Sequence, residues 1–217
     1  TQNILKAAND VIAKNTMRHD KKLFTQNEVG EKITLYQAID EYDEARFAVS
    51  RSQDLVRSGV DPNQIAFLYR TNFQSRVLEE VCLEKQLPYQ VVGTRFFDRK
   101  EIKDVVSYIK AAINEKDFTS LNRIINTPAR GIGKATILKI HDGEEASLSA
   151  RAQEKLADFR TLLSEIREVA KTKGPYDVVT LVFKRSTMED KFLKEGDDGF
   201  ERIQNIKELA TLAKKYS

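Results

Sequence analysis

A glycine-rich turn followed by a lysine stands near the centre of the sequence, in NTPARGIGKATILKI, residues 126–140. Such a turn exposes backbone N–H groups, which can hold the phosphates of a nucleotide or those of a nucleic-acid backbone. A P-loop needs a first glycine, four residues, and then Gly-Lys-Ser/Thr. Here Pro128 stands in the place of the first glycine and Ala135 follows the lysine. The spacing therefore argues against a nucleotide.

The same turn fits contact with a polynucleotide. Gly131, Ile132 and Gly133 separate two helical patterns, and Lys134 begins the second helix, whose N-terminal end attracts a phosphate. Arg130 adds positive charge. The alternative is a tight helix–helix turn that needs glycine only for its dihedral angles.

A second candidate site lies in YRTNFQSR, where Arg70, Thr71 and Asn72 end a predicted strand and open a helix that Asn72 can cap. Ligands commonly bind at this edge of an α/β sheet. Arg70 can pair with a phosphate, and Asn72 can hydrogen-bond a sugar or a base. Simple helix capping is the alternative.

An acidic group in AIDEYDEAR, residues 38–46, could hold a metal ion, because it follows an apolar strand pattern. Asp43 and Glu44 also lie in the first turn of the next predicted helix. Carboxylates there complement the helix dipole, which is the interpretation we favour.

Composition limits the other classes of function. The chain has 217 residues, of which 41% are hydrophobic and 32% charged, with a formal net charge of +3. No apolar run approaches the roughly 20 residues that cross a bilayer, so we expect no membrane partner. The single cysteine, Cys82, excludes an internal disulfide and fits a cytoplasmic protein. From Arg95 to Lys139 ten basic residues outnumber five acidic ones, around the glycine-rich turn.

The elements that position these sites fall into two parts. Strand patterns occur in KITLYQAI, QIAFLYR and PYQVVG, and they alternate with helical patterns at 41–59 and after Asn72. Beyond Phe96 only helical periodicity remains, and Gly174-Pro175 separates two of the helices. We therefore expect an α/β part, residues 1–97, followed by an all-helical part, residues 98–217.

Longer strings resemble the bacterial UvrD/PcrA/Rep family of superfamily 1 DNA helicases in order and spacing. They are QNILKAANDVIAKN, AFLYRTNFQSRVLEE, PYQVVGTRFFDRKEIKDVVSYI, LNRIINTPARGIGKATI and ERIQNIKELATLA, which together extend over nearly the whole chain. The resemblance implies that residues 1–97 are the first part of domain 2A, a RecA-like lobe with a parallel sheet. Residues 98–217 then correspond to domain 2B, a mobile helical insertion.

The resemblance also implies a function. The family couples ATP hydrolysis to 3′-to-5′ movement along single-stranded DNA and to duplex separation, in DNA repair and replication. Arg70 and Asn72 match positions that touch single-stranded DNA. Gly131, Ile132, Gly133 and the neighbouring Lys134 match the element that meets the duplex backbone. We expect the hinge between the two parts at Gly93, Thr94, Arg95, Phe96, Phe97 and Asp98.

The family's P-loop and metal-binding acidic pair precede the segment that this chain matches. We therefore expect a fragment of a helicase that binds no ATP and is catalytically inactive alone, whereas the parent enzyme uses ATP and magnesium. Repair or transcription proteins are its candidate protein partners. The competing hypothesis is that the helical part is a protein-interaction or regulatory module with incidental basic charge. Strongly salt-dependent DNA binding would favour the helicase.

Overall fold

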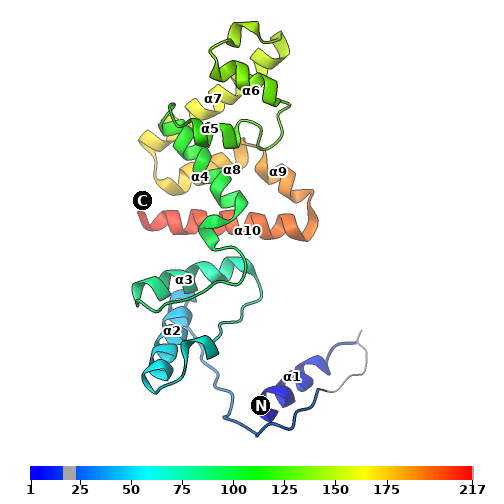
Figure 1. Cartoon of the computed structure of the whole chain (residues 1–217), viewed down its shortest axis with the longest axis vertical. Coiled ribbons are helices and arrows are strands. Elements are labelled where there is room, and N and C mark those ends of the chain that lie inside the picture. Colours follow the sequence, from blue (N-terminus) through cyan, green and yellow to red (C-terminus); the bar gives the residue numbers. More distant parts are fainter. Residues whose placement is uncertain (17–22, 217) are drawn as a thin grey trace. The chain divides into compact units, whose positions relative to one another are not determined.

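The computed structural model describes residues 1–16 and 23–216, apart from the side chains of Lys134 and His141. Its two compact units are Thr1–Ala48 and Val49–Ser217. Figure 1 labels the helices. No described helix combines the length and the apolar composition that crossing a bilayer requires.

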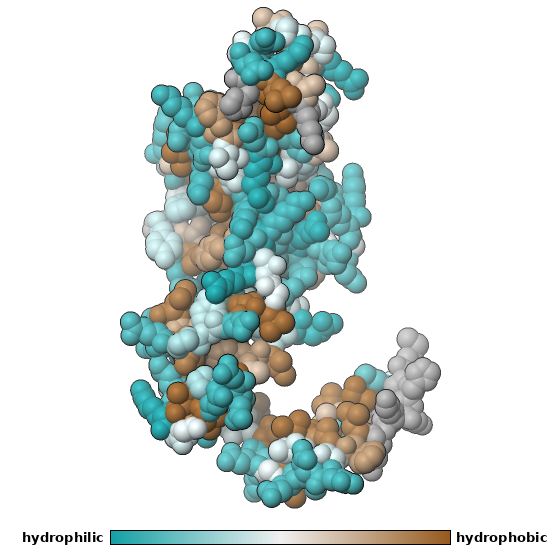
Figure 2. Space-filling model, viewed as in Figure 1, coloured by the Kyte–Doolittle hydropathy of each residue, from teal (hydrophilic) through white to brown (hydrophobic). Residues whose placement is uncertain are grey.

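The first unit contains helix α1 (Gln2–Ile12) and an extended segment that leads to the start of α2 (Glu41–Arg57). Side-chain amides hold α1 to the extended segment: Asn3 Nδ2 donates to the carbonyl oxygen of Gly30 at 3.0 Å, and Asn9 Nδ2 to that of Leu23 at 3.0 Å. No residue of α1 is buried. Its apolar side chains lie on the surface, as Figure 2 shows.

Carboxylates organise the start of α2. Asp40 Oδ1 accepts the backbone N–H of Asp43 at 2.7 Å, and Asp43 Oδ2 accepts the N–H of Ile39 at 3.1 Å and the hydroxyl of Tyr36 at 2.9 Å. The hydrogen bond from Ile39, followed by that from Tyr36, lowers the pKa of Asp43 below its usual value. Glu41, Asp43 and Glu44 occupy the first turn. This arrangement agrees with the helix-start interpretation of the acidic group.

The predicted parallel sheet is wrong, because the described residues contain no β-strand. Residues 32–38, 65–69 and 87–91, where strands were expected, are irregular chain that pairs with no other described segment. None of these residues is buried, and Leu35, Leu68 and also Val92, which follows the third segment, are at least 94% exposed. A strand requires a neighbouring strand for its backbone N–H and C=O groups. The alternation of apolar and polar residues therefore identified segments that are not helical, but it did not identify strands. The predicted α/β, RecA-like fold is corrected to an all-helical one.

The helices expected beyond residue 97 are present, and α8 begins at Pro175 after Gly174, as predicted. Short 3-10 helices occupy Pro62–Gln64, Asn72–Gln74, Phe96–Asp98, Glu145–Ser147 and Lys214–Tyr216. The second unit contains the remainder of α2 and α3 (Ser75–Glu84), α4 (Lys100–Ile113), α5 (Phe118–Ile124), α6 (Lys134–His141), α7 (Ala150–Thr172), α8 (Pro175–Arg185), α9 (Met188–Leu193) and α10 (Gly196–Ala213).

One hydrophobic core extends from Phe96 to Ala210 and draws on α4, α5, α7, α8, α9 and α10. Apolar residues at helical spacing produce it, because positions three and four apart share one face of a helix. Tyr108 of α4 and Phe159 of α7 lie edge to face, with ring centroids 6.4 Å apart. Both are almost fully buried.

Helix α10 has a second, polar face. Glu201, Asn205 and Glu208, here called the polar stripe, are spaced so that they share one side of the helix. Glu208 Oε1 accepts from the buried guanidinium of Arg76 on α3, with Nε 2.5 Å away. The polar stripe thus connects α10 to the segment that contains α3, while the apolar side of α10 packs into the core.

The buried side chain of Arg99 also connects α10 to the segment that contains α3. Its guanidinium, in a residue only 7% exposed, donates to the carbonyl oxygen of Asn72 at 2.8 Å, to Ser75 Oγ at 3.1 Å and to Asn205 Oδ1 at 2.7 Å. Asn205 Nδ2 in turn donates to Glu101 Oε1 at 2.7 Å. Every group in this buried network depends on its neighbours for a partner.

We predict that Asn205→Leu lowers the free energy of unfolding by about 2 kcal/mol, because Nη1 of the buried Arg99 loses its acceptor and Oε1 of Glu101 loses its donor. Urea denaturation measures this. Lys207→Leu, at an exposed position of the same helix, is the control and should change stability by less than about 0.5 kcal/mol. Equal effects of the two substitutions would contradict the assigned role of Asn205.

Candidate nucleic-acid interface

The Gly-Ile-Gly turn closes the connection between α5 and α6. Ile132 is 1% exposed and belongs to the core, whereas Gly131 and Gly133 on either side of it are exposed. Asn126 Oδ1 accepts the backbone N–H of Arg130 at 2.7 Å and that of Ile132 at 3.4 Å. The buried side chain and the asparagine hold the turn so that its glycine backbone faces solvent.

The two glycines of the turn meet different requirements. Gly131 has a φ of +71°, which favours glycine, and a Cβ there would collide with Nζ of Lys155. Gly133 has φ −80° and ψ 168°, a conformation that any residue adopts, and a Cβ there would meet no atom within 4 Å. Backbone conformation therefore explains Gly131 but gives no reason for glycine at 133.

Gly133 is the N-cap of α6, the residue before Lys134. The N–H groups of the first helical turn have no carbonyl partner within the helix, so they are available to an acceptor. No described side chain caps this end of α6. The missing side chain at Gly133 leaves those groups open to an anion, which the helix dipole favours.

Arg130 braces the turn from within. Its Nη1 donates to the carbonyl oxygen of Ile124 at the end of α5, at 3.1 Å, and to those of Thr127 and Pro128, at 3.2 and 3.3 Å. Its Nη2 contacts the hydroxyl of Tyr108. The predicted cation is thus present at the turn, but its guanidinium is directed into the fold.

Tyr108 supports the same turn by donating its hydroxyl proton to the carbonyl oxygen of Thr127 at 2.6 Å. Burial raises the pKa of Tyr108 to about 12, only partly offset by Arg130. The phenol therefore remains a neutral donor at physiological pH. The turn is thus supported by Tyr108 of α4 and by the guanidinium of its own Arg130.

Lys155 is a site residue that the sequence did not identify. It lies on α7, and its Nζ reaches the position beside Gly131. None of the ion pairs between described residues involves Lys155. The side chain of Lys134, the cation expected there, lies outside the described residues. A lysine from another helix thus brings positive charge to the glycine turn.

An open groove of about 480 Å³ runs from this lysine along α7. Arg130 and Phe159 line it. So do Arg185, at the end of α8, and Ser186 and Thr187, which follow it. Glu165 neutralises Arg185 through two hydrogen bonds of 2.8 and 2.9 Å. Lys155 and Arg130 therefore bring positive charge to this groove, and Asp158 adds a carboxylate to the same lining.

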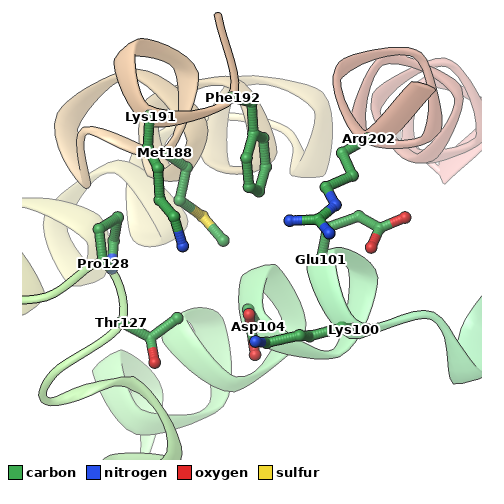
Figure 3. Close-up of a pocket in the computed structure, with 9 residues that line it drawn as sticks. All are labelled: Lys100, Glu101, Asp104, Thr127, Pro128, Met188, Lys191, Phe192 and Arg202. Carbon is green, nitrogen blue, oxygen red and sulfur yellow. The ribbon is translucent and has the colours of Figure 1, made fainter. Parts of the chain in front are cut away.

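A separate, small cavity adjoins Thr127 and Pro128 (Figure 3). Side chains of α4, including Lys100 and Asp104, face Lys191, Phe192 and Arg202 of α9 and α10 across it. Its volume of about 10 Å³ corresponds to roughly one water molecule. This cavity is too small for a nucleotide.

The structure also brings Arg70, Thr71 and Asn72 together, ahead of α3. Gln74 Oε1 accepts the backbone N–H of Thr71 at 3.0 Å and that of Arg70 at 3.1 Å. Thr71, rather than Asn72, is the N-cap of the short 3-10 helix there, which corrects the predicted cap. The Asn72 side chain donates instead to Glu201 of the polar stripe. Arg70 is exposed.

The predicted hinge, Gly93 to Asp98, begins at a glycine with few conformational restrictions and ends at residues that are held by contacts. Gly93 has a φ of +107° and open space around it, and Thr94 and Arg95 follow without regular structure. Phe96 is fully buried in the core, with Phe97 half exposed beside it. Asp98 pairs with Lys103 at 2.8 Å.

Known proteins resemble the whole chain. The family model of the UvrD-like helicase C-terminal domain matches residues 1–217. The chain is 37% identical over 235 residues to DNA helicase II of Escherichia coli and 35% identical over 234 residues to that of Haemophilus influenzae. It is 36% identical over 233 residues to the ATP-dependent DNA helicase PcrA of Staphylococcus epidermidis.

Each of these matches covers 100% of this chain but only 32% or 33% of the relative. The chain thus spans about a third of the length of the curated relatives it matches. Because the family model extends from the first residue to the last, the assignment rests on the entire sequence and not on the glycine-rich turn alone. The chain belongs to the UvrD-like helicase C-terminal domain family.

Proposed function

We propose that this chain is the DNA-contacting portion of an ATP-dependent 3′-to-5′ DNA helicase, and that residues 98–217 hold the backbone of duplex DNA. The observation that carries the proposal is Gly133, a glycine that neither its dihedral angles nor its neighbours require. A close approach of a ligand to the backbone is a further reason for glycine. The names of the relatives support DNA as that ligand.

In the proposed complex, a phosphate of the duplex accepts hydrogen bonds from the N–H groups at the start of α6. Lys155 adds a charge contact beside Gly131, and Lys134 adds a further cation. Arg130 shapes the turn through its carbonyl contacts and contributes positive potential. Because these groups recognise phosphate only, binding should not depend on base sequence.

Residues 1–97 would contact the single strand through Arg70, Thr71 and Asn72. The exposed guanidinium of Arg70 suits a phosphate, since arginine can present two N–H groups to one anion. Movement between residues 1–97 and 98–217 would use the stretch from Gly93 to Asp98. Phe96 is anchored in the core, so the bending would occur on its N-terminal side, at Gly93–Arg95. Such bending would have to open the contacts of Arg76 with Glu208 and of Arg99 with Ser75, which join α3 to residues 98–217.

ATP and magnesium would be bound by the parent enzyme outside this chain, and DNA repair and replication are the proposed setting. Repair or transcription proteins remain candidate partners of the parent. ATP hydrolysis by the purified chain would contradict the proposal that the ATP site lies outside it.

We predict that Gly133→Ala weakens binding to a duplex with a 3′ single-stranded tail by about tenfold, while stability falls only by the cost of an alanine N-cap, about 0.5 kcal/mol. The new methyl group would hinder a phosphate at the α6 N–H groups, and a lost charge-assisted hydrogen bond is worth about 1.5 kcal/mol. Fluorescence anisotropy measures the affinity, and thermal unfolding measures the stability. Gly131→Ala should lower both, because it strains the turn itself. Wild-type affinity in Gly133→Ala would make the turn a structural hairpin and favour the protein-interaction module.

Lys155→Gln should weaken duplex binding and reduce the slope of log affinity against log salt by about 0.9, the expected effect of losing one phosphate contact. Titrations at several salt concentrations measure the slope. Lys173→Gln is the matched control, since Lys173 directly follows the other end of α7, about 27 Å from Lys155 by the rise of a helix. Identical slopes for both variants would exclude Lys155 from the interface.

A further inference from the structure

Asn72 binds an internal carboxylate in this structure. Glu201 Oε1 accepts the backbone N–H of Asn72 at 3.2 Å, and the side-chain amide Nδ2 of Asn72 donates to the same oxygen. The two residues are 129 positions apart in the sequence. One anionic oxygen thus contacts both the backbone nitrogen and the side-chain nitrogen of a residue that the sequence predicts to contact nucleic acid.

The carboxylate is held differently from its neighbour in the polar stripe. Glu208 forms an ion pair with the buried guanidinium of Arg76. No ion pair between described residues involves Glu201, whose hydrogen bonds come from the neutral groups of Asn72. Among the charges that raise the pKa of Arg99, Glu201 has the smallest effect. Hydrogen bonds between an anion and neutral donors at an exposed site are readily exchanged for those of another anion. The contact at Glu201 is therefore the replaceable one of the two.

A phosphate oxygen would use the same donors, because carboxylate and phosphate oxygens both accept charge-assisted hydrogen bonds from N–H groups. Arg70 lies two residues before Asn72 and is exposed, so a phosphate that displaced Glu201 would also find a cation nearby. The negative charge of Glu201 would repel that phosphate for as long as the carboxylate remains in place.

We propose that Glu201 occupies the phosphate position at Asn72 and competes with the backbone of single-stranded DNA for it. The inference rests on the proposed contact between Asn72 and single-stranded DNA, and adds an internal competitor that sets its affinity. Binding of the strand releases the 72–201 contact. The Arg76–Glu208 pair and the Arg99–Asn205 hydrogen bond stay in place, so that α10 remains attached while one of its links opens.

The test is fluorescence anisotropy of the chain with a fluorescein-labelled oligo(dT) of about 16 nucleotides at low salt. Glu201→Ala should bind about fivefold more tightly than the wild type, and Glu201→Gln, which keeps the acceptor but not the charge, should lie between them. Asn72→Ala should bind more weakly. In the double variant Asn72→Ala/Glu201→Ala the gain from Glu201→Ala should disappear.

Asp198→Ala removes an exposed carboxylate from the same helix and controls for general charge. Thermal unfolding verifies that each variant is folded.

The outcomes separate the two proposals. Equal binding by the wild type and Glu201→Ala overturns the competition and leaves the DNA contact intact. A gain that persists without Asn72, or that Asp198→Ala reproduces, also overturns it, because the carboxylate would then act only through bulk charge. Absence of binding by every variant, Glu201→Ala included, rejects the single-strand contact itself and the competition with it.

Discussion

The buried guanidinium of Arg99 is the constraint on which the arrangement of the second unit depends. A charged group removed from water needs an acceptor for its N–H groups, so the chain must bring oxygens to it. They come from the loop before α3, from Ser75 and from Asn205 of α10. Burial lowers the pKa of Arg99 below its usual value, and Glu101 is the principal group that opposes this shift. The candidate single-strand site is thus built on a polar centre.

Helix α10 contacts two different parts of the unit because its sequence contains both an apolar and a polar helical pattern. Ile203, Ile206 and Leu209 face the hydrophobic core. The polar stripe faces Asn72, Arg76 and Arg99. Burial of the first set favours one rotation of the helix about its axis, and the acceptors of the second set need the same rotation. Agreement between the two faces explains how a helix far along the sequence can hold residues near position 72.

Sequence patterns predicted the local structure better than the contacts. The periodicity of α7 and the Gly174-Pro175 boundary depend on neighbouring residues only, so both were predictable. The strands were not, because a strand exists only with a partner. The turn itself was recognisable, but the inward direction of Arg130 and the position of Lys155 beside Gly131 depend on how α4 and α7 pack. The spacing of Glu201, Asn205 and Glu208 was a visible signal for the polar stripe, although not for its partners.

We expect the exposed extended segments to influence how the chain behaves in concentrated solution. Leu35, Leu68 and Val92 stand on irregular backbone whose N–H and C=O groups are not paired in a ladder. Such segments are templates for pairing between molecules, and proteins usually protect them with charge, proline or a covering element. We therefore expect the solubility of the isolated polypeptide to be limited by association between copies through these segments. Unfolding of the helical core should not be what limits it.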